Sequence, residues 1–285
     1  MPEPLVTKPI GTPFIELRSV DSTNNYAREQ IQASRSSKLP VSQGLAEHGM
    51  AFFAHEQLAG KGQRGKSWAS EPGSNIMLSI LLKPQGIPLA QQFRLSACVA
   101  VAVHEFFVKY AGEETKIKWP NDLYWQDRKA GGILIENIVR SNLSQEPRAR
   151  SPKPRAQSQE PGFTPDWDWS IVGIGININQ PHFPAHLPNP VSLKQITGKN
   201  FDTVVLAKEL CAVLNEKFNE LVNDGFENIY QQYLLHLYKR NEKVKLKKDN
   251  RVFEAIIKTI TPAGKLVVLH SVDEEFDFGE VELIF

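Results

Sequence analysis

Residues 60–67 read GKGQRGKS, and the next eight residues read WASEPGSN. The first string satisfies the P-loop pattern G-x-x-x-x-G-K-[ST], in which backbone N–H groups and a lysine hold nucleotide phosphates. A P-loop fold requires a helix directly after this pattern, because the helix N-terminus binds the phosphates. The stretch 60–75 therefore decides between a P-loop fold and another phosphate-binding architecture.

The residues that follow the glycine-rich string do not suit that helix. Pro72 and Gly73 fall within its first two turns, and both disfavour a helix interior. Residues 75–82 then read NIMLSILL, which indicates a buried strand. A P-loop enzyme also needs an apolar strand that ends in a metal-binding Asp, whereas the best apolar strand ends in Asn177 and Asn179. The sequence therefore predicts a loop between two strands.

This predicted loop combines glycines with positive charge. Lys61, Arg64 and Lys66 match the charge of a phosphate or a carboxylate, and the glycines let the backbone approach an anion closely. A solvent-exposed glycine-rich turn would have the same composition. The loop alone does not decide between these two interpretations.

Composition restricts the class of protein. The chain has 285 residues, with 33 Lys+Arg against 32 Asp+Glu, and this near-neutral balance gives no global field that would attract nucleic acid. No apolar run approaches the ~20 residues of a membrane helix, and residues 1–8 lack the apolar core of a signal peptide. Cys98 and Cys211 are isolated in apolar, helical settings, where we expect reduced core residues. The sequence predicts a cytoplasmic protein without nucleic-acid or membrane partners, and its histidine spacing and lack of a nucleophile motif do not indicate zinc or hydrolytic chemistry.

Hydrophobic periodicity predicts strands and helices that do not alternate strictly. After a helix-capping DSTN cluster at 21–24, a helix is expected to reach about residue 32. This mixture of elements indicates an α+β fold with a mixed β-sheet and packed helices. Further helices are expected at 89–110, 203–223 and 226–238, and strands near 50–56, 75–83, 117–119, 123–125, 133–139 and 169–179.

The amino-acid pattern changes at two places along the chain. Residues 141–168 are rich in Ser, Pro, Gln and Arg, and they cannot bury enough apolar surface to offset their ordering entropy. We therefore expect a disordered hairpin insertion there. From about residue 239 the chain contains only short strand patterns, with Asn250 and Gly264 in turns. The predicted organisation is a catalytic domain at 1–238, which contains the insertion, and a small β domain at 239–285.

Polar clusters lie at the ends of the expected elements. They are DSTN at 21–24, Gln57 with the glycine-rich loop, KWPND at 118–122, KAGG at 129–132 and GIGIN at 173–177. Each cluster also has a structural explanation, such as a helix cap, a turn, a bulge or close strand packing. Lys118 and Lys129 fit those explanations less well, because each adjoins a sequence that is expected to be buried. Two such lysines with a basic glycine loop suit a bound polyanion.

In order and spacing, these clusters resemble the catalytic domain of the biotin protein ligases (biotin–[acetyl-CoA-carboxylase] ligases). The matching pieces are S-T-N, Q-x-x-G-[KR]-G, K-W-P-N-D, K-x-x-G-I-L-x-E and G-x-G-[IL]-N, over about residues 14–285 without the insertion. The spacing from K-W-P-N-D to K-x-x-G-I-L is the most specific part. The resemblance implies the mixed sheet of biotin/lipoate ligases and class II aminoacyl-tRNA synthetases, followed by a small SH3-like β-barrel.

The resemblance also implies a two-step reaction. The biotin carboxylate attacks the α-phosphate of ATP with the help of Mg²⁺, which gives biotinyl-5′-AMP and pyrophosphate. A lysine of a biotin carboxyl carrier domain then attacks this anhydride, which gives an amide and AMP. Both steps need neutralised charge and fixed geometry rather than a protein nucleophile. A loop that orders on binding would keep water from the anhydride.

For the biotin end of the site, the resemblance assigns residues from several clusters. Ser22, Thr23 and Gln57 would bind the ureido group, with Asn24 beside them. The backbone would line the biotin slot at Gly132, Ile133, Gly173 and Gly175.

For the phosphate end, the resemblance assigns the glycine-rich loop and the lysines. Lys129 would stabilise charge between the biotin carboxylate and the α-phosphate, and Lys118 would contact phosphate. Asp122 would orient or deprotonate the incoming lysine of the carrier. Asn121 would help to hold Mg²⁺, and Asn177 would form a hydrogen bond with the edge of the adenine base. The loop residues expected to cover the carboxylate and phosphates are Gly60, Lys61, Gly62, Gln63 and Arg64.

The chain departs from the family pattern at two places. The family loop commonly reads G-R-G-R, whereas this chain has Gln63 at the second arginine position and its arginine one residue later, at Arg64. This shift leaves the contact geometry of the loop open. The stretch 188–193 reads PNPVSL, so we assign no aromatic partner for adenine there.

Other functions remain possible on the same motifs. The first alternative is a lipoate or octanoate ligase of the same fold, and the second is a non-catalytic biotin-binding protein. A biotin-responsive DNA-binding repressor is disfavoured, because the Ser22-Thr23 motif leaves little room for a preceding DNA-binding domain and the net charge is +1. Both a monomer and a homodimer are compatible with the sequence.

Overall fold

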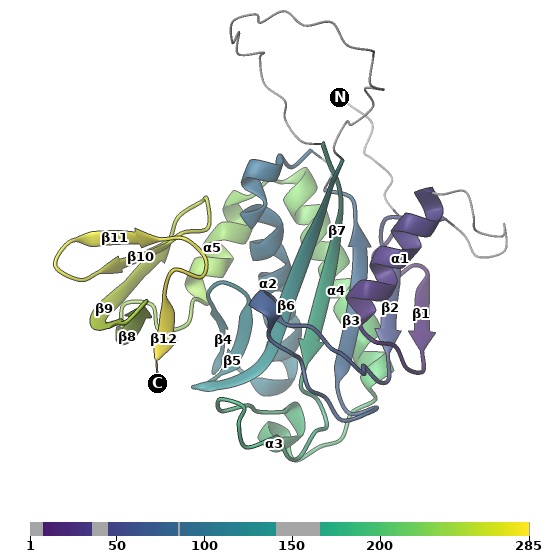
Figure 1. Cartoon of the computed structure of the whole chain (residues 1–285), viewed down its shortest axis with the longest axis horizontal. Helices are drawn as coiled ribbons and strands as arrows, with labels where there is room; N and C mark the ends of the chain where they lie inside the picture. The colour runs from purple at the N-terminus through teal and green to yellow at the C-terminus, as the bar shows by residue number, and fades with distance from the viewer. Residues whose placement is uncertain (1–7, 36–44, 85, 141–165, 285) are drawn as a thin grey trace, which may run out of the picture.

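A mixed seven-stranded sheet forms the centre of the protein (Figure 1), with the strand order β1-β2-β3-β7-β6-β5-β4. The computed structural model describes residues 8–35, 45–84, 86–140 and 166–284. β1 and β2 are parallel, and the other neighbouring strands of this sheet are antiparallel. The strands are β1 (Phe14–Leu17), β2 (Ala51–Ala54), β3 (Ile76–Leu82), β4 (Thr115–Lys118), β5 (Asp122–Trp125), β6 (Arg128–Arg140) and β7 (Asp166–Ile176).

Helices cover both faces of this sheet (Figure 1). The larger apolar cluster lies on the face covered by α2 (Phe93–Ala111), α4 (Thr203–Asn223) and α5 (Glu227–Leu235). A smaller cluster on the other face includes Ala27 and Ile31 of α1 (Thr23–Arg35). Successive strand residues face opposite sides of a sheet, so Leu78 and Ile80 of β3 enter the larger cluster and Leu81 the smaller one.

The helix pattern of the sequence agrees with most of the observed helices. α4 has the predicted bounds, and the Asp202 side chain caps it by accepting hydrogen bonds from Val204 N at 2.9 Å and Val205 N at 3.0 Å. α2 begins at Phe93 rather than at 89, because residues 89–91 form a separate 3₁₀ turn. The short helix α3 (Leu193–Thr197) was not predicted, although Ser192 and Gln195 form a capping box at its start.

The glycine-rich string is followed by no helix before β3, as predicted. It connects β2 to β3, and its only helical part is the 3₁₀ turn Gln63–Gly65. Gly73 has a φ of +71°, a left-handed conformation that ends a helix. The structure therefore confirms that the match to the P-loop pattern has no P-loop context.

A second, five-stranded antiparallel sheet follows α5, with the order β11-β10-β9-β8-β12. Trp119 Nε1 donates a 2.9 Å hydrogen bond to Gly264 O, which joins the turn after β4 to this sheet. Its buried residues belong to the larger apolar cluster, so the two sheets share one core. The strands are β8 (Lys243–Lys248), β9 (Arg251–Ile260), β10 (Leu266–Leu269), β11 (Asp273–Phe276) and β12 (Glu282–Ile284).

One boundary of the predicted insertion is wrong. β7 begins at Asp166, so residues 166–168 are part of a strand rather than of an insertion that ends at 168. Trp167 is buried against the larger cluster, and Asp168 forms an ion pair with Arg35 of α1, which explains why the strand extends this far. The rest of the predicted insertion, 141–165, lies outside the described residues.

The remaining sequence expectations concern cysteines and membranes. Cys98 and Cys211 are buried and unbonded, as predicted for core residues. Burial raises the pKa of the Cys211 thiol to about 12, which keeps it protonated and unreactive. In the part of the chain that the structure describes, no helix is long and apolar enough to cross a membrane.

Candidate functional site

A cavity of about 650 Å³ lies where the loops of the large sheet meet the second sheet. This volume is in the range of small-molecule binding sites. Every site residue predicted from the sequence lines the cavity except Gly60. The structure thus brings together clusters from five separate parts of the chain, which are 22–24, 57–64, 118–122, 129–133 and 173–177.

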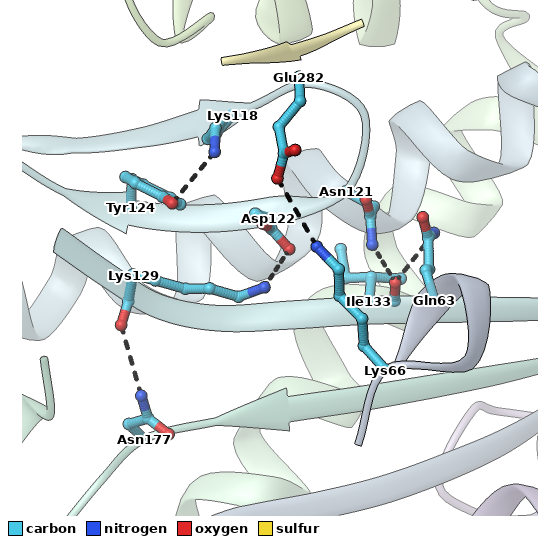
Figure 2. Close-up of polar contacts among 10 residues, drawn as sticks. All are labelled: Gln63, Lys66, Lys118, Asn121, Asp122, Tyr124, Lys129, Ile133, Asn177 and Glu282. Carbon is cyan, nitrogen blue, oxygen red and sulfur yellow. Dashed lines mark hydrogen bonds and ion pairs between the residues drawn. The ribbon is translucent and has the colours of Figure 1, made fainter. Parts of the chain in front are cut away.

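The cavity contains a carboxylate placed between two lysines (Figure 2). Lys129 Nζ lies 2.6 Å from Asp122 Oδ1, and Lys118 Nζ lies 3.1 Å from the hydroxyl of Tyr124. Burial lowers the pKa of Lys118, and the nearby Asp122 charge opposes this effect. Lysines gathered in a partly buried cavity stabilise a bound anion more strongly than surface lysines do. This half of the cavity is therefore suited to phosphates and carboxylates.

A β-bulge gives the lysine and carboxylate their positions. Leu123 of β5 pairs with Gly131, whereas Tyr124 pairs with Lys129, so Ala130 is an extra residue on β6. Bulges re-aim the side chains next to them. The bulge places Lys129 where its side chain reaches back to Asp122, the first residue of β5.

Two asparagines of the site are partly used by the protein itself. Asn121 Nδ2 donates to Ile133 O, and Asn177 Nδ2 donates to Val191 O at 3.1 Å. Neither amide oxygen accepts a hydrogen bond from another described residue, so both oxygens can face a ligand. Among the described residues, no group of three or more His, Cys, Asp or Glu side chains could hold a metal ion. A cation here would depend on the Asn121 oxygen and on ligand phosphates, which is a common arrangement for Mg²⁺.

The glycine-rich loop is a small closed hairpin. Gly62 N donates to Lys66 O at 2.7 Å, and Trp68 N donates to Gly60 O at 2.9 Å. A Cβ added at Gly60 would lie 2.5 Å from Trp68 O, so only glycine permits this closure. Gly60 thus shapes the base of the hairpin, while residues 61–64 line the cavity.

The cations of this loop contact other parts of the protein. Lys61 Nζ donates to Asn25 Oδ1 at the start of α1. Arg64, at a φ of +56°, donates from Nη1 to Gly279 O at 2.9 Å, and Lys66 Nζ lies 3.9 Å from Glu282 Oε1. Two of the three loop cations therefore contact the second sheet and the segment that leads into β12.

The second sheet contributes a wall of the cavity that the sequence did not predict. Phe278, Gly279 and Glu282 line the cavity, and the Phe278 ring meets the Trp119 ring edge-on at 6.2 Å. No sequence signal indicated this wall, because it depends on how the second sheet packs against the turn after β4. Phe183 and Pro188 also line the cavity and were not predicted.

Neutral polar groups form the other half of the cavity. Gln57 Oε1 accepts from Thr23 N at 2.8 Å, and both residues line the cavity together with Ser22. Asn24 is buried, and its Nδ2 donates to Glu136 Oε2 at 2.7 Å. Ser79 was not predicted, although it is the one polar residue in the IMLSILL strand. Glu136 is the last residue of the K-x-x-G-I-L-x-E motif, but no role was assigned to it.

Strand glycines make close approaches within this half. A Cβ at Gly173 would lie 2.4 Å from Asn24 Oδ1, and one at Gly175 would lie 2.6 Å from Trp68 Cε2. Gly132 differs, because its Cβ would have no neighbour nearer than 3.4 Å. The Trp68 indole lines the cavity, and within the described residues its buried Nε1 has no hydrogen-bond acceptor.

Known proteins of several organisms are similar to this chain. Residues 17–146 match the model of the biotin/lipoate A/B protein ligase family. Over these residues the chain is similar to that family. The bifunctional ligase/repressor BirA of Escherichia coli (strain K12) is 37% identical over 208 residues, which are 72% of this chain and 53% of that protein. The biotin–[acetyl-CoA-carboxylase] ligase of Paracoccus denitrificans is 27% identical over 259 residues, which are 88% of this chain and 92% of that protein.

Solved structures show the same fold for this chain. The biotin protein ligase from Aquifex aeolicus in complex with biotin and ATP superimposes with a TM-score of 0.69 at 24% identity, over 95% of this chain and 97% of that one. This chain spans 59%, 50% and 53% of the lengths of three BirA proteins, from Bacillus spizizenii, Bacillus subtilis and Escherichia coli. The resemblance drawn from the motifs is confirmed at the level of the family.

Proposed function

We propose that this protein is an ATP-dependent biotin ligase. It activates biotin as biotinyl-5′-AMP and transfers it to a lysine of a biotin carboxyl carrier domain. One observation carries the proposal: an anion-binding half, with Lys118, Lys129 and Asp122, and a neutral polar half, with Thr23 and Gln57, share one cavity. The names of the relatives, and of an Aquifex aeolicus ligase bound to biotin and ATP, support it.

In the first step, the two halves of the cavity would hold the two ends of biotin. Ser22, Thr23 and Gln57 bind the ureido group, and the glycine-lined strands let the backbone approach the ring system. Lys129 lies at the junction of the biotin carboxylate and the α-phosphate, where it stabilises the charge that builds up as the bond forms. Asp122 orients the Lys129 ammonium through their 2.6 Å contact.

The phosphates of ATP extend from this junction toward the loop and Lys118. In this role Arg64 and Lys61 would exchange their present contacts with Gly279 O and Asn25 for contacts with phosphate. The Asn121 oxygen would help to hold Mg²⁺, which neutralises phosphate charge when bound. The Asn177 oxygen is available to an adenine amino group, since its nitrogen is used by Val191 O.

In the second step, the carrier lysine would enter from the side of the second sheet. Asp122 lies close enough to Lys129 to orient the incoming amine at the same centre. We propose that residues 239–285 form a small SH3-like β domain packed on the catalytic domain, and that its segment 278–283 closes this entrance. We place the reaction in the cytoplasm, because both buried cysteines are unbonded. Repression, the second activity in the BirA names, is not part of the proposal.

One assay tests the proposed chemistry. The full chain is incubated with Mg²⁺-ATP, labelled pyrophosphate and one acid at a time, and label appearing in ATP is measured. We expect exchange with biotin but not with lipoate or octanoate, and a mass increase of one biotinyl group on a carrier domain. A carrier whose acceptor lysine is replaced by arginine should remain unmodified.

Each alternative gives a different result in this assay. Exchange with lipoate or octanoate alone would support the related ligase. Biotin binding without exchange or carrier modification would support a non-catalytic biotin-binding protein.

A further inference from the structure

A chain of hydrogen bonds runs from a surface ion pair to the neutral half of the cavity. Arg28 Nη2 lies 2.8 Å from Glu136 Oε1, and Asn24 Nδ2 donates to Glu136 Oε2 at 2.7 Å. Asn24 Oδ1 lies 2.6 Å from Ser79 Oγ, which lies 2.7 Å from Thr23 Oγ1. Ser79 and Asn24 are buried, so this chain is protected from water.

The charge of Glu136 fixes the orientation of the Asn24 amide. A carboxylate only accepts hydrogen bonds, and so does the carbonyl Leu134 O, which lies 3.4 Å from Asn24 Nδ2. The amide nitrogen must therefore face these two groups. The amide oxygen, which also only accepts, is then the group that faces Ser79.

This orientation determines where the hydroxyl protons lie. Since Asn24 Oδ1 cannot donate, the single Ser79 hydroxyl proton must point to it. The 2.7 Å contact between Ser79 and Thr23 then requires the Thr23 hydroxyl proton. Thr23 has no second proton for Gln57 Oε1, which lies farther away at 3.2 Å and already accepts from Thr23 N. Thr23 Oγ1 therefore presents only lone pairs to the cavity.

We propose that Glu136 is a positioning residue that, through Asn24 and Ser79, fixes the Thr23 hydroxyl as a hydrogen-bond acceptor. The site then selects a ligand group that donates an N–H at this point and discriminates against an isosteric acceptor. This inference rests on the proposed function, in which a ureido N–H of biotin is that donor. An acceptor facing the lone pairs of Thr23 would leave both groups unpaired in a buried place.

Replacement of Glu136 by glutamine should reverse the donor and acceptor roles along this chain of hydrogen bonds. Arg28 only donates, so the amide oxygen of the introduced glutamine would face Arg28, and its amide nitrogen would face Asn24. The Asn24 amide would then flip, giving up its 3.4 Å contact with Leu134 O, and would donate to Ser79, whose proton would turn to Thr23. Thr23 would gain a proton to donate into the cavity. The change keeps the size of the side chain and reverses the preference for donor and acceptor.

The test compares two ligands by equilibrium binding. The first is biotin, and the second is a set of biotin analogues in which oxygen replaces one ureido N–H. We expect the wild-type chain to bind biotin at least 10-fold more tightly than the analogue altered at this point. Glu136→Gln should reduce that preference at least 10-fold, with the thermal unfolding midpoint measured in parallel.

Two further variants test whether Glu136→Gln acts by reversing hydrogen-bond directions or only by disturbing the local structure. Arg28→Gln removes the ion pair but keeps the accepting carboxylate, so the preference should remain as in wild type. The double variant Arg28→Gln/Glu136→Gln lets the glutamine turn its oxygen to Asn24, and should recover part of the preference. A structural role alone would give no such recovery. If Glu136→Gln does not fold, Ser79→Ala, which interrupts the chain, should lower the preference instead.

The outcomes distinguish this inference from the proposed function. If wild type does not bind biotin, the proposed function fails. If wild type binds biotin and strongly prefers it, but neither Glu136→Gln nor Ser79→Ala changes the preference, the inference about Glu136 is wrong while the proposed function stands.

Discussion

Lys129 Nζ lies 2.6 Å from Asp122 Oδ1, and this ion pair links β5 to β6 inside the cavity. Both side chains are partly shielded, with 31% of Lys129 and 22% of Asp122 exposed. An ammonium held in this way is oriented before a ligand arrives, so less reorganisation is needed as charge develops. The pair therefore connects the fold of the bulged hairpin to the first step of the proposed reaction.

Replacement of Lys129 by glutamine should remove most of the activation step. The amide keeps hydrogen-bonding capacity but not the charge, and loss of one transition-state donor costs about 100-fold or more in rate. Biotin-dependent exchange of pyrophosphate into ATP measures this loss. Lys247→Gln is the matched control, because Lys247 is exposed on β8. Equal activity of both variants would contradict the role of Lys129.

Asp122→Asn separates two roles of the carboxylate. The amide oxygen can still accept from Lys129, so we expect activation to fall by about 10-fold, which corresponds to ~1.4 kcal/mol. Transfer from preformed biotinyl-5′-AMP to the carrier should fall further, because the amide cannot take up a proton. Single-turnover transfer is the measurement. Normal transfer with impaired ATP use would show that Asp122 acts only on Lys129.

Gly175→Ala should disturb the site far more than Gly132→Ala. The new methyl group at Gly175 would lie 2.6 Å from Trp68 Cε2 and would push the indole away, whereas at Gly132 no atom would lie nearer than 3.4 Å. We expect the KM for biotin or ATP to rise at least 10-fold only for Gly175→Ala, with a change in tryptophan fluorescence. Similar kinetics for the two variants would argue against the close contact.

Gly279→Ala should affect ATP through Arg64. The added Cβ would lie 2.8 Å from Arg64 Nη1, at a residue whose φ is +87°. Gly112→Ala is a matched control, because Gly112 has a φ of +79° but no neighbour within 4 Å of an added Cβ. Both variants should lose about 1–3 kcal/mol of stability from backbone strain. Only Gly279→Ala should change the KM for ATP. An equal change in both variants would refute the effect of Gly279 on ATP through Arg64.

Acid should destabilise the protein through His104. Burial and the neighbouring His236 ring lower the pKa of His104 to about 4 from 6.5. Between these values the unfolded chain binds a proton that the folded protein does not, so the stability present above about pH 6.5 is lost as the pH falls toward 4. At ~1.4 kcal/mol per pKa unit, the loss is at most about 3.5 kcal/mol. Urea unfolding at several pH values measures it.

His104→Gln should flatten this dependence, since the amide can donate to Thr115 O as His104 Nε2 does at 3.0 Å. His186→Gln, at an exposed histidine, is the control that should leave the dependence unchanged. A pH dependence that is the same in all three proteins would assign the effect to another group.

The sequence predicts best the elements whose pattern is local. α4 has an uninterrupted apolar stripe and a capping Asp202, and its predicted bounds agree with the structure. Pro72 and Gly73 exclude a helix after the glycine-rich loop without any tertiary information. Strands β1 and β11 were not predicted, because neither FIEL nor DEEF alternates strictly between apolar and polar residues.

The residues of the site also differ in how far a local pattern predicts them. Short motifs identify Lys118, Asp122, Lys129 and Thr23, because each lies beside a turn or a strand end with a distinctive spacing. The contacts of Ser79 and Glu136 could not be predicted, since they join β3 and β6 to α1 across the sheet. The contact from Arg64 to Gly279 O joins residues 215 positions apart, and no local pattern carries such information.

One end of the long β6–β7 hairpin lies at the cavity, and the other end lies far from it. Gly132 pairs with Gly175 at the cavity, and Arg140 pairs with Asp166 at the opposite end, eight residues or about 26 Å farther along β6. The paired Arg140–Asp166 end of the hairpin is therefore far from the cavity, with a continuous strand ladder between the two. A label attached at this end of the ladder is expected to leave the geometry of the cavity unchanged.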